Sequence, residues 1–166
     1  YIVTGIKTGE ELNKVIKYDI HIFGIYLNNF KEELNILPQV LKLLVINGYG
    51  FNQQIDNLPQ SLKSLIIVDH CFNQKIDKLP QSLKSIKICG NMFNQKLDNL
   101  PKLLNTIKLG WCPFFDQKLN NLPQKLKSLS INGHNFNQRL DKLPHTLRIL
   151  NICLLYTSEL PTIFAV

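Results

Sequence analysis

Six of the eight prolines of this chain recur at a nearly constant spacing, and that spacing limits what the chain can fold into. They stand at positions 38, 59, 80, 101, 123 and 144, so the step is constant except for one extra position between 101 and 123. The same string surrounds these prolines, and its clearest copy is FNQKIDKLPQSLKSIKI at residues 72–88. A fixed period of this length is typical of solenoids, in which each coil contacts only its neighbours. The sequence therefore predicts a stack of about six coils, each of about 21–22 residues.

Each coil begins with a segment in which inward-pointing apolar positions alternate with outward-pointing positions. In residues 62–68 we expect Leu65 and Ile67 to point inward, and Ser64, Ile66 and Val68 to point outward, because side chains alternate along a strand. Burial of each inward side chain is worth roughly 1.5–3 kcal/mol. One coil cannot offset its own chain entropy, whereas a stack of coils can.

The second half of each coil is predicted to be an extended or turn-rich return arm. Proline lacks an N–H group and fixes φ, so it belongs in a turn or at an unpaired edge. We also expect a short second strand at residues 73–76. The fold class is therefore a β-rich solenoid with a continuous apolar core and no pocket for chemistry.

Residues 1–19 are expected to form an N-terminal flank or cap with one short helix. The helix is predicted over residues 8–18, because Thr8 can cap its first turn and Glu11 can complete a capping box. Two interpretations remain open: the helix covers the first coil, or it is the end of a domain further upstream. The chain begins at Tyr1 without a methionine, so we expect a fragment of a longer protein.

The array is expected to span residues 20–152. Phe23 and Ile25 fall one full repeat before Leu44 and Ile46, so a degenerate first strand with Phe23 and Ile25 inward is predicted there. After Ile152 the repeat stops. Residues 153–166 form a non-repeat tail that resembles the translated end of an adapter used in sequencing libraries, and a natural capping segment is the alternative.

The repeat resembles the FNIP repeat family, a leucine-rich-repeat-like family of social amoebae and giant DNA viruses. The resemblance rests on the pattern Phe-Asn-Gln-x-Ile/Leu-Asp-x-Leu-Pro-x-x-Leu-Lys-x-Leu-x-Ile and covers about residues 30–152. Most members have proline at the fourth place, where this chain has Gln54, Lys75, Lys96, Lys118 and Arg139. The resemblance implies a leucine-rich-repeat-like fold and a non-enzymatic module for protein–protein interaction. In viral relatives such arrays often follow an F-box, which implies the substrate-binding part of a ubiquitin ligase adaptor, although no F-box is visible here.

The outward side of the predicted strands carries the main candidate binding site. Its early coils are apolar, its middle coils carry lysine, and its late coils are small and polar. A contiguous apolar patch on a solvent-facing surface usually marks a contact site. The residues expected to meet a protein partner are Leu43, Val45, Ile66, Val68, Lys87, Lys108 and Trp111. Ordinary β-branched strand composition is the alternative for the apolar four, and packing over the adjacent coil is the alternative for Trp111.

A column of basic residues supports a second hypothesis, that of a polyanion- or nucleic-acid-binding protein. The column consists of Lys42, Lys63, Lys84, Lys127 and Arg148, in a chain of formal net charge +7. Only two of the 19 basic residues are arginines, which disfavours phosphate recognition, because phosphate sites usually prefer arginine. A solvated lysine edge that discourages aggregation explains the same column. We therefore do not expect nucleic acid as the main partner.

No catalytic, cofactor-binding or metal-binding pattern emerges above the repeat. The four cysteines lack CxxC spacing, and His70 and His134 share one repeat position three coils apart, roughly 14 Å by strand spacing. Free thiols favour a reducing compartment, so we expect an intracellular protein, in the cytoplasm of the host if the source is viral. No apolar run approaches membrane-spanning length. We expect a monomeric array with a protein partner of unknown identity and no cofactor.

Overall fold

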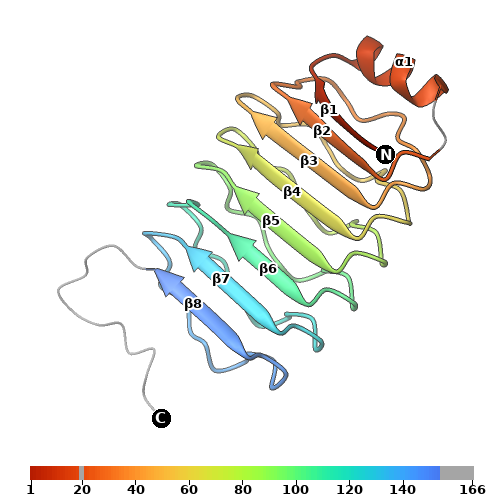
Figure 1. The fold of residues 1–166 in the computed structure, drawn as a ribbon. Coiled ribbons are helices and arrows are strands. Elements are labelled where there is room, and N and C mark those ends of the chain that lie inside the picture. The colour runs from red at the N-terminus through yellow and green to blue at the C-terminus, as the bar shows by residue number, and fades with distance from the viewer. Residues whose placement is uncertain (19–20, 154–166) are drawn as a thin grey trace.

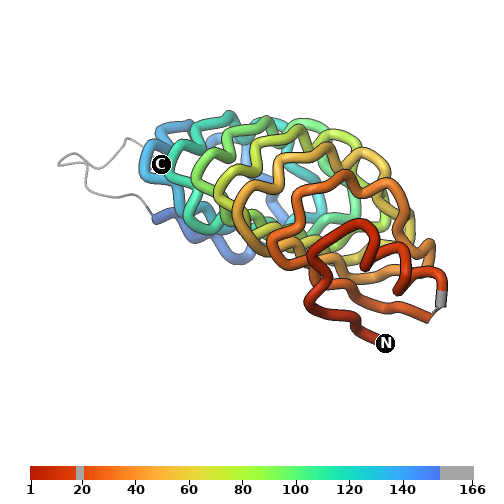
Figure 2. The backbone as a smooth tube through the Cα atoms, turned by 90° about the horizontal axis from the view of Figure 1, so that it is seen from above, coloured from red at the N-terminus to blue at the C-terminus, as the bar shows by residue number. Residues whose placement is uncertain are grey.

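Eight parallel strands in sequence order form one continuous sheet in the computed structural model, which describes residues 1–18 and 21–153 (Figure 1). The strands are β1 (Ile2–Ile6), β2 (Gly24–Asn28), β3 (Leu43–Gly48), β4 (Ser64–Asp69), β5 (Ser85–Cys89), β6 (Thr106–Leu109), β7 (Ser128–Asn132) and β8 (Ile149–Cys153). Helix α1 (Gly9–Tyr18), the one helix among the described residues, connects β1 to β2. Seen from above in Figure 2, successive coils stack one behind another. The predicted β-rich, leucine-rich-repeat-like solenoid with one short helix is confirmed.

The sheet includes the N-terminal flank, because β1 pairs in parallel with β2. Helix α1 lies at this end of the array (Figure 1). The predicted capping box is present: the Glu11 amide donates to Thr8 Oγ1 at 3.2 Å, and the Thr8 amide donates to Glu11 Oε2 at 3.4 Å. Leu12 is buried in the core that runs through all coils. The helix therefore covers the apolar interior of the first coils.

A column of phenylalanine rings runs through the interior. Rings in neighbouring coils lie 6.0–6.1 Å apart at interplanar angles of 4–15°, from Phe51 through Phe72, Phe93 and Phe115 to Phe136. Near-parallel rings at this separation are an offset-stacked arrangement, which is favourable beyond the area that it buries. Columns of leucine and isoleucine from the strands and the return arms fill the rest of the interior.

Asparagine side chains next to the phenylalanines tie each coil to the next one. Asn52 Oδ1 accepts the Asn73 amide at 2.9 Å, and Asn73 Oδ1 accepts the Asn94 amide at 3.0 Å. Asp116 takes the same role further along and accepts the Asn137 amide at 2.9 Å. These side chains form a ladder of hydrogen bonds along the array.

The return arm contains no second strand in the described residues, so the strand expected at residues 73–76 is wrong. The amide of Asn73 is satisfied by a side chain of the neighbouring coil, so it does not take part in a second backbone ladder. Past the proline, a tight turn closes the arm, as where the Leu83 amide donates to the Pro80 carbonyl at 3.0 Å.

The register of the first predicted strand is also wrong. Ile25 pairs with Leu44 and Leu27 with Ile46, so the offset between these strands falls two positions short of the repeat. Phe23, expected to point inward, is 53% exposed. The turn between β2 and Phe30 is correspondingly shorter than the equivalent turns between later strands and their phenylalanines. Asn29 in this turn has a φ of 53°.

Candidate functional site

The outward face of the sheet carries rows of side chains that cross the strands, because every consecutive pair from β2 to β8 is paired in unbroken parallel register. The middle row contains, in order, Tyr26, Val45, Ile66, Lys87, Lys108, Ser130 and Asn151. Four of the residues predicted to bind a partner, one from each of β3 to β6, thus lie in a single line.

The apolar part of this face is contiguous. Val45 pairs with Ile66, and Leu43 and Val68 lie two positions away from them on the same strands and the same face. The corrected register of β2 places Tyr26 directly beside Val45, which extends the apolar surface by one strand. Val45 itself is only 8% exposed, since Tyr26 and Ile66 flank it. A partner would therefore contact mainly Leu43, Ile66 and Val68.

Two lysines follow the apolar patch. Lys87 and Lys108 are register partners on β5 and β6, and neither forms an ion pair with any described residue. Like charges placed directly opposite each other on neighbouring strands are destabilising. The two lysines therefore destabilise the array locally. Both cations lie on the outward face without an ion-pair partner among the described residues.

Trp111 lies apart from these residues. It occupies the turn after β6, where the coil carries its one extra residue, at a φ of 49°. Its side chain is 52% exposed and meets His134 of the next coil edge-on, with ring centroids 5.0 Å apart. This agrees with the packing interpretation and separates Trp111 from the sheet face.

The turns that follow the strands form an exposed aromatic edge that sequence reasoning missed. Tyr49 stacks on His70 with ring centroids 4.6 Å apart, and Phe114, three positions after Trp111, is 54% exposed. These residues differ from coil to coil at equivalent positions, so periodicity gave no signal for them.

The basic column lies where the chain enters each strand. The Lys63 amide donates to the Lys42 carbonyl and the Lys84 amide to the Lys63 carbonyl, both at 2.9 Å. Asn105 occupies the next position and interrupts the column before Lys127 and Arg148. The five basic residues therefore form a group of three and a group of two.

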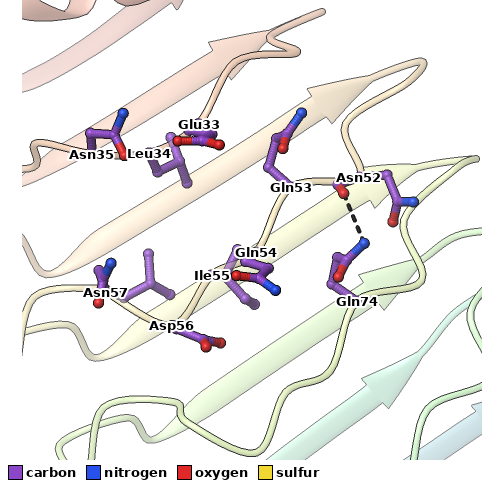
Figure 3. A pocket seen from close by; sticks show the side chains of 11 residues that line it. Glu33, Leu34, Asn35, Asn52, Gln53, Gln54, Ile55, Asp56, Asn57 and Gln74 are labelled. Atoms are coloured by element: carbon purple, nitrogen blue, oxygen red, sulfur yellow. Dashed lines mark hydrogen bonds between the residues drawn. The ribbon is translucent and has the colours of Figure 1, made fainter.

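The return arms enclose shallow polar grooves, which were not predicted. Three of them, of about 340, 350 and 370 Å³, lie along the array. Figure 3 shows the first one, where Gln74 Nε2 donates to the Asn52 carbonyl at 2.9 Å. Repeat amides and charged side chains line these grooves, and their hydrogen bonds serve the coil-to-coil ladders.

Asp69, at the end of β4, is the only buried charged residue in the described part of the chain. Its Oδ1 accepts the amides of Gly50 and Cys71 at 3.0 and 2.9 Å, and its Oδ2 accepts the buried amide of Phe51 at 3.0 Å. The carboxylate therefore fastens two neighbouring turns to each other.

The thiols are free, as predicted. Burial raises the pKa of Cys112 to about 12, which keeps this thiol protonated and unreactive near neutrality. Within residues 1–18 and 21–153, no group of three or more histidine, cysteine or acidic side chains could hold a metal ion. No described helix is long and apolar enough to cross a membrane.

The repeats match a known family. The profile of the FNIP Repeat matches residues 26–70 and 72–112, together just over half of the chain. The chain belongs to the FNIP repeat family. Its repeats account for the phenylalanine column, the asparagine ladder and the proline turns described above.

A solved structure has a similar fold. The crystal structure of CroV588, described as a novel circular LRR protein, superposes with a TM-score of 0.69 at 35% sequence identity. The match covers 79% of this chain and 20% of CroV588, so this chain spans about a fifth of the length of that protein. No curated protein matches the chain. The resemblance to FNIP and leucine-rich repeats inferred from the sequence is thereby confirmed.

Proposed function

We propose that this chain is a protein-binding repeat module that holds its partner on the outward face of the sheet, around Leu43, Ile66 and Val68. The observation that carries the proposal is the continuity of an apolar patch across adjacent strands of a solvent-facing sheet. Coils at the other end place serine, asparagine or lysine at the same positions, so the fold does not require apolar residues there.

Membership of a leucine-rich-repeat-like family supports a non-enzymatic role. FNIP and leucine-rich-repeat solenoids generally act as scaffolds for interaction. Service as the substrate-binding part of an F-box ubiquitin ligase adaptor is the finer version of the proposal, and an intracellular location goes with it. Co-purification of the full-length protein with a ubiquitin ligase core would test that version.

To test the proposal, two apolar residues of the sheet face are replaced by the residues that other coils carry at the equivalent positions. Ile66→Lys introduces the residue found in β5 and β6, and Val68→Asn introduces the residue found in β3 and β7. The double variant should fold normally and lose proteins that the wild type captures from cell extract.

The matched control is Asn99→Lys, which adds the same charge on a return arm at a position where another coil has Lys78. Capture should survive this change. Capture that is equal for all three proteins would refute binding through the sheet face.

The polyanion hypothesis predicts a different outcome in the same assay. A nucleic acid held by the basic column would be released by nuclease and by about 1 M sodium chloride, where the Debye length is about 3 Å. A protein held by apolar contact would be retained under both conditions.

A further inference from the structure

We propose that the sheet face takes an extended protein segment that crosses the strands and carries an acidic residue two positions after an aliphatic one. The inference rests on the proposed function and specifies the chemistry of its partner. The aliphatic side chains would lie over Ile66 and Val68, and the carboxylates would lie over Lys87 and Lys108.

The direction of the segment follows from the middle row of the face. Val45, Ile66, Lys87 and Lys108 succeed one another on β3, β4, β5 and β6, so a ligand that runs across the strands meets apolar surface first and cationic surface next. A ligand that ran along one strand would meet either the apolar patch or a single lysine.

The array itself leaves the two lysines without a counter-charge. Their neighbours on the same strands and the same face are neutral: Ser85 and Cys89 on β5, and Thr106 on β6. The acidic residue on the neighbouring strand β4, Asp69, has its carboxylate buried and occupied by three amides. Two register-paired cations without a described partner are therefore complementary to carboxylates supplied from outside.

The spacing of the face suits an extended peptide. Neighbouring strands are about 4.8 Å apart, and alternate residues of an extended chain are about 6.7 Å apart. A carboxylate two residues after an aliphatic side chain over Ile66 would thus reach between Lys87 and Lys108. A polynucleotide offers phosphates at a comparable spacing but has no aliphatic group for Ile66 and Val68.

The experiment is a selection of random dodecapeptides displayed on phage against the folded chain. We expect the selected peptides to share an aliphatic residue followed two positions later by aspartate or glutamate. Their binding to Lys87→Ser/Lys108→Ser, measured by fluorescence anisotropy, should weaken about threefold to tenfold, as expected for losing two exposed ion pairs. Serine stands at this position in β7, so the variant remains within the natural repertoire of the array.

The outcomes separate this inference from the proposed function. Peptides that depend on Ile66 but lack acidic residues, or that bind Lys87→Ser/Lys108→Ser unchanged, would overturn the inference and leave the sheet face as the binding site. Peptides that bind Ile66→Lys as tightly as the wild type would overturn both. Single-stranded DNA that binds the chain more tightly than the selected peptides, with the same dependence on Lys87 and Lys108, would overturn the inference in favour of a polyanion.

Discussion

Replacement of Asp69 by alanine should loosen two neighbouring coils at once. The carboxylate accepts three amides, of which that of Phe51 is buried and the other two are partly buried. A buried amide left without an acceptor costs about 1–3 kcal/mol, and the two partly buried amides can regain water and cost less. Removal of a buried charge returns part of this free energy. We expect a net loss of about 2–4 kcal/mol.

Asp69→Asn should be only partly tolerated. Its one remaining oxygen can keep the amides of Gly50 and Cys71, but its NH₂ group then faces the Phe51 N–H, and both are donors. Asp77→Ala is the matched control, because it removes the same charge from an exposed position.

Native-state hydrogen exchange is the appropriate assay, because coils of a solenoid can open locally. The free energy of opening at the Phe51 amide should fall by the amount given above in Asp69→Ala. It should stay unchanged in Asp77→Ala. A loss below about 0.5 kcal/mol, within the range of ordinary surface substitutions, would show that the carboxylate does not fasten the two turns.

Three further predictions concern the asparagine ladder, the phenylalanine column and the buried thiol of Cys112. Asn73→Ala removes one step of the asparagine ladder and should lower the free energy of unfolding, measured by urea titration, by about 1 kcal/mol. Asn73→Asp should be nearly neutral, because the carboxylate of Asp116 already accepts the equivalent amide in a later coil. Phe93→Ala deletes one ring from the column and should cost about 3–5 kcal/mol, again by urea titration; a smaller loss would mean that the neighbouring rings close the gap. The pKa of the Cys112 thiol is raised from 9.0 to about 12 in the folded protein, so the unfolded chain loses this proton at a lower pH. The free energy of unfolding should therefore fall as pH rises above 9. Cys112→Ala should remove that part of the pH dependence of the urea midpoint.

The repeat pattern was sufficient to predict the strands of the sheet and their register from β3 onwards, but not the conformation of the return arms. The alternation of polar and apolar residues in Ser128–Asn132 predicts which side of each equivalent strand is buried. The constant step between prolines predicts that equivalent residues lie in register. The asparagine ladder follows from the same periodicity. These features are local and repeat in every coil, so the pattern in each coil independently supports the same structural prediction.

The first coil could not be predicted in this way. Phe30 keeps the regular repeat step to Phe51, but the missing two residues lie between β2 and Phe30 and shift the strand relative to that reference point. A tight turn with a positive φ at Asn29 compensates for the deletion, and a Cβ on Gly48 would come within 2.7 Å of Asn29. Periodicity contains no information about where within a coil a deletion falls.

The candidate site was predicted in outline only. The outward position of Ile66 and Val68 followed from alternation, but the burial of Val45 depends on Tyr26, whose place required the true register. Asp69 ends β4 and fastens the turns beyond the strands, and the aromatic edge lies in those turns. Those side chains are defined by contacts between coils, and a single repeat does not reveal such contacts.

Site-specific photocrosslinking tests the central claim most directly. A benzophenone amino acid placed at Val68, on the sheet face, should form a covalent adduct with a partner protein in cells that express the chain. The same residue placed at Asn99, exposed on a return arm, should form little or none. Equal adducts from both positions, or an adduct from Asn99 alone, would contradict binding through the outward face of the sheet.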